Sequence, residues 1–308
     1  MIRYDEMSDS SIKLLGNTPG FIRLLHTMRM VAVTDASVMI SGEKGAGKTS
    51  LAKEIHACSR RKTRPFKVIN CAGMPEDDFS SFFSVGQPEK AGYPDIIRGG
   101  TLFLDEVGEL SDRSQSILFH FLDTTNSDLD LRVVSSTSRD LMERVAVNRF
   151  REDLFYRLYV VPLEIPPLRE RADDLILLLK HFSREISAAY KRPAPHYSVS
   201  SRNLLRAYSW PGNLRELHNL CERMVILMAG KIVQPESLPL EIRRGKTNKN
   251  SEALFALPAG GIDLLAMEGD MIRQALRMTG GNRSKAARLL RLTRDTLLYR
   301  IQKHKIEV

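Results

Sequence analysis

Residues 37–49, SVMISGEKGAGKT, decide the fold of this chain. Residues 37–41 predict a short buried strand, and Gly42–Thr49 match the pattern G-x-x-x-x-G-K-[ST]. Glycines let the backbone curl so that its N–H groups face phosphate oxygens, and the helix predicted over residues 48–59 adds its dipole. A chance glycine turn is the alternative. The strand before the pattern and the helix after it favour a phosphate-binding loop.

Such a loop predicts ATP and Mg²⁺ as cofactors. Lys48 would contact the β- and γ-phosphates, and the Thr49 hydroxyl would bind Mg²⁺. The predicted nucleotide-binding residues of the loop are Gly42, Glu43, Gly45, Ala46, Gly47, Lys48 and Thr49.

Residues 99–106, GGTLFLDE, supply the acidic half of such a site. An apolar strand ends here in Asp105 and Glu106. Asp105 would hold Mg²⁺ through water, and Glu106 would polarise the water that attacks the γ-phosphate. Acids often end strands, so this pattern is weak alone. Beside the loop at 42–49 it predicts ATP hydrolysis as well as ATP binding.

Short apolar runs alternate with amphipathic stretches between residues 10 and 171, which predicts a doubly wound α/β domain with a parallel sheet. From residue 172 to residue 242 the strand signal fades, and an all-helical unit is expected. Residues 243–261 form a polar linker to a small all-α unit at 262–308. In the α/β part the remaining expected strands are 67–70, 101–105, 131–136 and 160–164, and the remaining helices 20–33, 112–122 and 138–147.

The composition is that of a folded protein, with 308 residues of which 43% are hydrophobic and 27% charged. No run reaches the roughly 18 apolar residues that a membrane helix needs, and the polar start of the chain is no secretion signal. Three widely spaced cysteines predict neither a disulfide framework nor a metal site. We therefore expect a reduced, cytoplasmic protein with no membrane partner.

The net charge of +9 is concentrated near the end of the chain. Residues 243–308 carry 14 Lys and Arg against 6 Asp and Glu, whereas residues 1–242 carry 32 against 31. A concentrated positive patch is typical of nucleic-acid binding, and a merely solvated tail is the alternative. Charge alone does not separate the two.

The helical pattern of the tail favours DNA. Residues 281–290 predict a short amphipathic helix, Thr293 is a good N-cap, and residues 294–304 predict a second helix. With a first helix over 263–279, this is the pattern of a helix-turn-helix domain, which commonly docks on DNA as a dimer. The apolar stripe of the first helix fits either a core or a dimer partner. The residues expected to contact double-stranded DNA are Arg283, Ser284, Lys285, Arg294, Thr296, Tyr299, Arg300 and Lys303.

Several strings resemble one known family: Gly42–Thr49, VINCAGMPEDDF at 68–79, GGTLFLDEVGELS at 99–111, FREDLFYRLYVVPLEIPPLRERADDL at 150–175 and WPGNLREL at 210–217. They are similar to the AAA+ domain of bacterial enhancer-binding proteins, the ATPases that activate sigma-54 RNA polymerase. The resemblance implies an AAA+ ATPase subdomain at 10–171 and its helical lid at 172–242. The tail resembles the Fis-type DNA-binding domain that ends many of these proteins.

The resemblance implies roles for further residues. Asn70 matches the asparagine that couples to the glutamate of the acid pair. Arg151 and Arg157 match arginine fingers, which reach the nucleotide of a neighbouring subunit and stabilise transition-state charge. Arg215 matches the lid arginine that senses the γ-phosphate. Fingers that act in trans imply a homo-oligomer, commonly a hexameric ring. The alternative for any one of these arginines, taken alone, is a surface ion pair that contributes little.

The sequence departs from the family at two loops. Between Gly86 and Gly99 it has no counterpart of the GAFTGA string that grips sigma-54 in typical members. The segment between Leu122 and Leu131, where a second pore loop is usual, is also short. We therefore expect both pore loops to be reduced.

Three single residues depart as well. Ser138 stands at the sensor position, where the family usually has Asn; its hydroxyl can still bond a water beside the phosphate, but it has no amide. Asn148 and Arg291 stand where the family has glycine. Asn tolerates a left-handed backbone, so Asn148 is a mild change, whereas Arg291 is less easily accommodated.

Three functions remain open on the sequence alone. The first is a DNA-binding transcriptional regulator with an ATP-binding core that does not remodel sigma-54 RNA polymerase by itself. The second is a true sigma-54 activator that uses a different contact surface or a partner subunit. The third is a P-loop ATPase for another substrate. No receiver domain fits before Ser10, so control is expected through expression level, a partner regulator or oligomer assembly.

Overall fold

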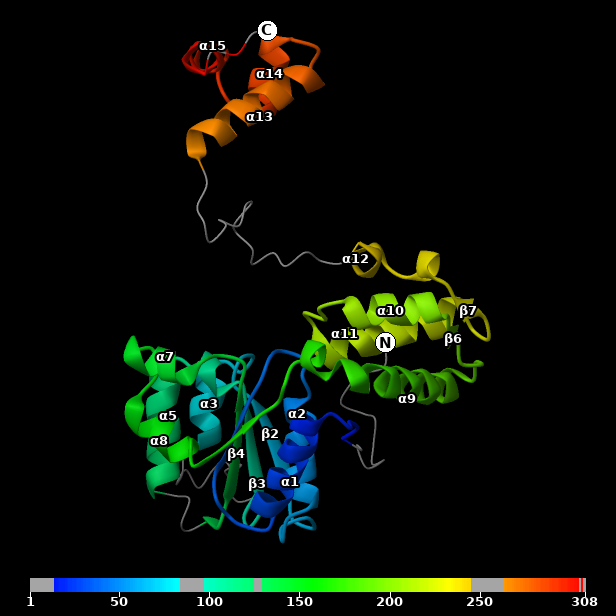
Figure 1. The fold of residues 1–308 in the computed structure, drawn as a ribbon. Helices are drawn as coiled ribbons and strands as arrows, with labels where there is room; N and C mark the ends of the chain where they lie inside the picture. Colours follow the sequence, from blue (N-terminus) through cyan, green and yellow to red (C-terminus); the bar gives the residue numbers. More distant parts are fainter. Residues whose placement is uncertain (1–13, 84–96, 125–128, 245–262, 305, 307–308) are drawn as a thin grey trace. The chain divides into compact units, whose positions relative to one another are not determined.

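In the computed structural model, five short parallel strands form a sheet in the first of two compact units (Figure 1). The structure describes residues 14–83, 97–124, 129–244, 263–304 and 306, and the units, 1–246 and 247–308, are considered separately. The strand order is β2-β3-β4-β1-β5, which confirms the predicted doubly wound α/β fold. The strands are β1 (Val38–Ser41), β2 (Phe66–Asn70), β3 (Thr101–Asp105), β4 (Arg132–Thr137) and β5 (Val161–Glu164).

Alternate residues of each strand enter two separate hydrophobic cores, because successive side chains of a strand point to opposite faces. On β1, Met39 packs in one core, whereas Val38 and Ile40 pack in the other. Helices α1 (Pro19–Ala32) and α2 (Lys48–Ala57) cover one face of the sheet (Figure 1). The other face is covered by α3 (Glu76–Phe83), α5 (Asp112–Thr124), α7 (Leu141–Ala146) and α8 (Glu152–Leu158).

Two of these helices, α3 and α8, were not anticipated as helices from the sequence. Each begins with acidic residues in its first turn, which complement the helix dipole. Helix α3 buries Phe79, Phe82 and Phe83, and Phe83 lies edge-on to Phe121 of α5 with the ring centroids 4.8 Å apart. The predicted shortened loops fall largely on residues 84–96 and 125–128, and most of the predicted linker falls on 245–262. These segments lie outside the described residues.

The second half of this unit is a helical lid with its own core around Trp210. Trp210 is buried, and its indole N–H donates to the Leu205 carbonyl over 2.9 Å. A two-residue strand pair, β6 (His196–Tyr197) with β7 (Ile232–Val233), departs from the expected all-helical unit, because strands this short leave no periodic signal. The lid helices are α9 (Ala172–Tyr190), α10 (Val199–Ala207), α11 (Asn213–Leu227) and α12 (Leu240–Arg243), and the short 3₁₀ helices of the unit are Val107–Glu109, Leu168–Arg171 and Pro235–Ser237.

A buried ion pair joins the segment before α1 to the lid. Asp174 is fully buried and accepts hydrogen bonds from the backbone N–H groups of Asn17 and Thr18, from the Thr18 hydroxyl and from Arg171 Nε at 3.0 Å. Arg171 also donates to the Leu15 carbonyl over 2.7 Å. Burial alone would raise the pKa of Asp174, but these donors outweigh it and hold that pKa below its usual value.

We expect Asp174→Ala to lower the free energy of unfolding of the first unit by about 3–5 kcal/mol, because the buried Arg171 cation loses its partner. Urea unfolding followed by Trp210 fluorescence measures this. The neighbouring Asp173 is exposed, so Asp173→Ala is the matched control. Since the folded state lowers the pKa of Asp174, its stabilisation is present above the ordinary carboxyl range and is lost as the pH falls. Equal stabilities of the two variants at neutral pH would contradict a stabilising role for the Asp174–Arg171 ion pair.

The second unit contains three helices, α13 (Leu264–Met278), α14 (Arg283–Leu289) and α15 (Arg294–Lys303), around a core that includes Ile272, Ala286 and Leu297. Each helix has a side-chain N-cap, which is why it starts where it does. Thr293 caps α15 by accepting from the Thr296 N–H over 3.2 Å, as the sequence predicted. Asp263 and Asn282 cap the other two helices.

The turn between α14 and α15 contains Arg291 in a left-handed conformation, with φ +55°. This explains why glycine is usual at this position. In a left-handed conformation the Cβ of an L-residue lies too close to the following carbonyl oxygen, which costs energy that glycine avoids. Two preceding glycines, Gly280 and Gly281, make the earlier turn in the same region of φ without that cost.

Arg291→Gly should therefore stabilise the second unit by about 1 kcal/mol. Hydrogen exchange of the α14 and α15 amides in the whole chain measures the effect and should be slower in the variant. Arg288→Gly is the control: Arg288 is also exposed but lies within α14, where glycine costs about 1 kcal/mol, so exchange should be faster. Faster exchange in both variants would show that Arg291 makes a stabilising contact that outweighs its strain.

Candidate nucleotide site and DNA-binding surface

Lys48 lies at the centre of the predicted phosphate loop. It is the first residue of α2 and follows Gly47, whose φ of +107° suits glycine. Its Nζ donates to the carbonyls of Gly42 at 2.9 Å and Glu43 at 3.1 Å, and it pairs with Glu106 Oε1 at 3.0 Å. The loop therefore folds around its own lysine and brings it to the acid pair at the end of β3.

The acid pair is held by serines of the neighbouring strand. Ser136 of β4 donates its hydroxyl to Asp105, and accepts from the Glu106 N–H over 3.2 Å. Ser138 donates both its N–H and its hydroxyl to Glu106 Oε2, each over 2.8 Å. Burial would raise the pKa of Glu106, but Lys48 and Ser138 outweigh it and hold that pKa below its usual value. Glu106 is thus a carboxylate with both oxygens bonded.

Asn70 lies beside Asp105 in the register of β2 and β3, yet its side chain faces a different partner. Its Oδ1 accepts from the Ala72 N–H over 3.1 Å. Within the described part of the chain, the side-chain partners of Glu106 are Lys48 and Ser138. The coupling of Asn70 to Glu106 that the resemblance implies is not a contact of this structure and stays a prediction.

Contacts between lid and loop involve two residues that the sequence analysis did not single out, Asn213 and Arg169. Asn213 is fully buried at the start of α11, and its Nδ2 donates to Glu43 Oε2 at 3.0 Å and to the Lys44 carbonyl at 3.2 Å. Arg169 Nη2 lies 2.7 Å from Glu43 Oε1. The hydrogen bonds from Arg169 and then Asn213 lower the pKa of Glu43. Glu43 was predicted to contact nucleotide, but its carboxylate faces the lid.

Gly45 shows how closely the lid approaches the loop. A Cβ at this position would lie 2.3 Å from the Gly212 carbonyl oxygen and 3.3 Å from the Arg215 Cβ. The Leu214 N–H also donates to the Gly45 carbonyl over 3.0 Å. The structure thus brings Arg215, the predicted lid arginine, next to Gly45 of the phosphate loop. The predicted nucleotide-binding residues Ala46 and Thr49 lie on the same loop.

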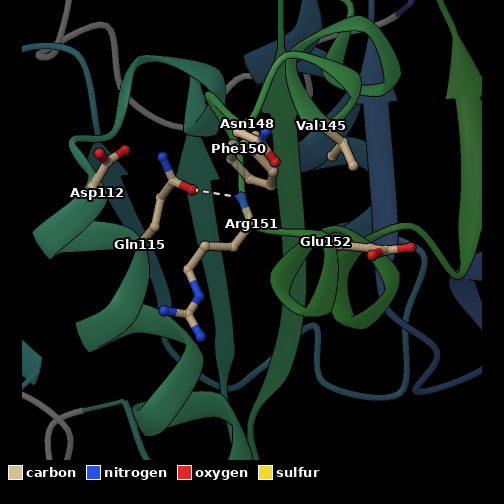
Figure 2. A pocket seen from close by; sticks show the side chains of 7 residues that line it. All are labelled: Asp112, Gln115, Val145, Asn148, Phe150, Arg151 and Glu152. Carbon is tan, nitrogen blue, oxygen red and sulfur yellow. Dashed lines mark hydrogen bonds between the residues drawn. The ribbon is translucent and has the colours of Figure 1, made fainter.

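Of the two predicted finger arginines, Arg151 is the N-cap residue of α8 and Arg157 lies in its last turn. A buried glutamine, Gln115, fixes the turn before this helix, because its Oε1 accepts from the Arg151 N–H over 2.8 Å (Figure 2). Its Nε2 donates to the Leu110 carbonyl over 3.1 Å. The Arg151 guanidinium is half-exposed and pairs with Asp153. Arg157 donates to the Leu122 carbonyl over 2.9 Å. Figure 2 shows the pocket formed here by Asp112, Gln115, Val145, Asn148, Phe150, Arg151 and Glu152.

Asn148 in this turn has φ +54°, so the position that is glycine in the family is left-handed here too. The expectation that Asn148 is a mild change agrees with this conformation, because Asn is enriched in the left-handed region.

The predicted DNA contacts of the second unit differ in exposure. Ser284 and Thr296 are half-buried, and the remaining ones apart from Arg300 are exposed, namely Arg283, Lys285, Arg294, Tyr299 and Lys303. Arg300 was expected to face outward, but Arg300 Nη1 donates to Glu268 Oε1 on α13. His304 Nε2 lies 2.9 Å from the other oxygen of the same carboxylate. The Arg300 guanidinium thus links α15 to α13 and is 37% exposed, and its contact with DNA stays a prediction.

The predicted apolar stripe of α13 faces the core of its own unit only in part, since Met267 is half-buried and Ala275 is buried, whereas Leu264, Met271 and Met278 are exposed. Leu264, Met271 and Met278 are 74%, 45% and 71% exposed, whereas Ile272 and Ala275 are buried. Of the two explanations open from the sequence, packing within this unit accounts for Ala275 and, in part, for Met267, and leaves Leu264, Met271 and Met278 available to a partner.

Family models match the chain in three consecutive parts: the sigma-54 interaction domain at 14–164, the AAA+ ATPase lid domain at 169–254, and a bacterial regulatory protein domain of the Fis family at 265–304. The transcriptional regulatory protein ZraR of Salmonella typhimurium is 36% identical over 315 residues, covering 96% of this chain and 70% of ZraR. The chain belongs to the family of sigma-54-dependent transcriptional regulators. This membership excludes the third function considered from the sequence, a P-loop ATPase for another substrate.

Further similar proteins match most of the chain. The regulatory protein AtoC of Escherichia coli is 35% identical over 96% of this chain and 68% of AtoC. Crystal structures of NtrX from Brucella abortus superpose with a TM-score of 0.70 for the ADP complex, at 30% identity, and 0.69 for the ATP complex, at 31% identity. They cover 97% and 96% of this chain, and 70% and 69% of NtrX. Across the described segments, every helix is too short or too polar to cross a bilayer.

Arg294 and Arg300 allow a test of the DNA surface. We expect Arg294→Ala to weaken binding to the target DNA by about 1–3 kcal/mol if it contacts a base edge, because the first residues of a recognition helix enter the major groove. Arg300→Ala should instead lower the melting temperature of the second unit through loss of its contact with Glu268. Fluorescence anisotropy and thermal unfolding separate the two. Sequence-selective loss of affinity in Arg300→Ala with unchanged stability would restore Arg300 as a base contact.

Proposed function

We propose that this sigma-54-dependent regulator binds specific DNA through residues 263–304, binds and hydrolyses ATP at residues 42–49, and does not remodel sigma-54 RNA polymerase by itself. The observation that carries the last part is the sequence of residues 80–98, SSFFSVGQPEKAGYPDIIR, which contains no GAFTGA string. The assembled acid pair and phosphate loop support the ATP-dependent part.

The residues around Lys48 fit ATP with Mg²⁺. The glycine backbone, the N-terminus of α2 and the amino group of Lys48 suit phosphate oxygens, and Thr49 and Asp105 are hard oxygen donors of the kind that Mg²⁺ prefers. Bound Mg²⁺ would supply charge neutralisation between the β- and γ-phosphates. Glu106 would orient the attacking water, and Arg215 would contact the γ-phosphate from the lid. Nucleotide binding is also supported by the ADP and ATP complexes of NtrX.

An oligomer is part of the same proposal. Arg151 and Arg157 are exposed on α8 and its N-terminal turn, where they would serve the nucleotide of a neighbouring copy in a ring. The outward stripe of α13, with Leu264, Met271 and Met278, would pair two copies on adjacent half-sites of DNA. A dimer on DNA and a ring of ATPase domains are compatible because different surfaces form them.

The decisive experiment uses the purified chain with ATP, sigma-54 RNA polymerase and promoter DNA, with AtoC as the positive control. Genome-wide mapping of bound DNA supplies the target promoters. We expect ATP binding and promoter binding but no open complex from this chain alone. An open complex formed by this chain and ATP would support a true activator with a different contact surface. An open complex that needs a second regulator would identify the partner subunit.

Lys48→Ala should abolish tight ATP binding, measured by calorimetry, because it removes the cation that faces the phosphates. Lys53→Ala, an exposed lysine one turn later on α2, is the matched control and should bind ATP like the wild type. Unchanged ATP affinity in Lys48→Ala would show that the phosphates bind elsewhere.

A further inference from the structure

The loop between α2 and β2 carries a concentration of positive charge that the nucleotide site does not use. Residues 1–242 as a whole are nearly neutral, with 32 Lys and Arg against 31 Asp and Glu. Within them, residues 55–75 contain no Asp or Glu and five Lys or Arg, namely Arg60, Arg61, Lys62, Arg64 and Lys67. The loop precedes β2, so it lies at the edge of the sheet where the strands begin, whereas the phosphate loop follows β1. Nucleotide binding therefore does not explain these cations.

Arg61 fixes this loop, residues 59–65, to the edge of the sheet. Its Nε donates to Asp35 Oδ1 over 2.8 Å, and its Nη2 donates to Asp130 Oδ1 over 2.6 Å. Within the loop, the Ser59 hydroxyl donates to the His56 carbonyl over 2.7 Å and accepts from the Arg61 N–H over 3.0 Å. The backbone of the loop is thus held in place before any partner binds, which lowers the conformational entropy that binding would cost.

Three cations surround this anchor and are exposed: Arg60, Lys62 and Arg64. Within the described segments, their side chains form no hydrogen bond or ion pair with the rest of the chain. A single surface cation of this kind is ordinary. Three of them on one fixed turn of the chain form a positive patch, which we call the basic loop.

The acids that contact the basic loop do not neutralise it. Asp35 and Asp130 are both bound to Arg61, so two carboxylates face one guanidinium and the three exposed cations besides. The hydrogen bond from Arg61, followed by the charges of Arg61, Arg132 and Arg60, outweighs burial and lowers the pKa of Asp35. The carboxylates stay ionised and the loop keeps an excess of positive charge.

A fixed group of exposed cations fits a polyanion, and duplex DNA is the polyanion that this chain meets. Arg and Lys bind DNA phosphates, which carry one charge per about 1.7 Å of helix axis. Once the second unit is on its site, the adjoining DNA is present at high effective concentration. Residues 245–262 join the units, and a chain of that length spans at most about 60 Å, or about 18 base pairs.

We propose that the basic loop contacts the phosphate backbone of the DNA that flanks the site bound by residues 263–304, through Arg60, Lys62 and Arg64. This rests on the proposed DNA binding of the second unit. The contact adds affinity and salt dependence but no sequence preference, because phosphates are alike at every base pair. It gives the ATPase unit a hold of its own on promoter DNA.

The first test measures fluorescence anisotropy of two duplexes with the whole chain. One duplex carries only the target site found by genome-wide mapping, and the other adds flanks of about 40 base pairs, twice the reach of residues 245–262. The triple variant Arg60→Gln, Lys62→Gln, Arg64→Gln should bind the long duplex about 10-fold more weakly, with a log–log salt slope shallower by about 2–3. Its affinity for the short duplex should equal that of the wild type.

The matched control removes the same charge from exposed positions of the lid, with Lys180→Gln, Arg184→Gln and Lys231→Gln. It should bind both duplexes like the wild type. An unchanged affinity of the loop variant for the long duplex, or an equal loss in the lid variant, would overturn the proposal. If the wild type binds neither duplex, the DNA-binding part of the proposed function fails and this proposal with it. If it binds both equally, only the basic loop is excluded.

A second measurement needs no substitution in the basic loop. Cys58 is exposed at the C-cap of α2, directly before the loop, whereas Cys71 and Cys221 are buried. Iron–EDTA tethered to Cys58 should therefore cleave the long duplex in its flanks. Cys58→Ser, treated in the same way, gives the background. Cleavage of the flanks no stronger than in Cys58→Ser would overturn the proposal.

Discussion

The ion pair between Lys48 and Glu106 depends on the order of three parallel strands. Strand β1 delivers the phosphate loop, β3 ends in the acid pair, and β4, which lies between them, ends in the serines. Because all strands are parallel, their carboxyl ends meet at one edge of the sheet, and ligands of such sheets bind there. Any shift of register on β3 or β4 would separate Glu106 from Ser138, so the site and the sheet are specified together.

Charged side chains hold the opposite edge of the sheet, where the strands begin. Arg132, fully buried on β4, donates to the carbonyls of Ala32 at 2.7 Å and Val31 at 2.9 Å and so caps the end of α1. Arg61, which is half-buried, joins the exposed Asp35 and Asp130 and the Gly99 carbonyl in the loops that precede β1, β3 and β4. Such groups stabilise only when every partner is present, since an unpaired buried charge is costly. The unit therefore combines three apolar cores with a small number of obligatory polar contacts.

The local parts of this architecture could be predicted from the sequence, and the long-range polar contacts could not. Strands with apolar runs, the phosphate loop and the Thr293 cap depend on adjacent residues, so their patterns are visible in the chain. The contacts of Arg300 with Glu268 and of Asn213 with Glu43 join residues 32 and 170 positions apart. Nothing in the periodicity of α15 tells whether its arginine turns to DNA or back to α13. Ser138 was noticed as a departure from the family. Its two hydrogen bonds to Glu106 could not be predicted, because they depend on how β3 and β4 lie beside each other.

The contact of Asn213 with the phosphate loop has a kinetic consequence. Since lid and loop share hydrogen bonds at Glu43, Lys44 and Gly45, the lid cannot swing outward without breaking them and exposing the buried amide of Asn213. The residence time of a nucleotide would then be set by how often these bonds break together, and not by the strength of the phosphate contacts alone. Under the proposed function, exchange of ADP for ATP would therefore be limited by opening of the lid.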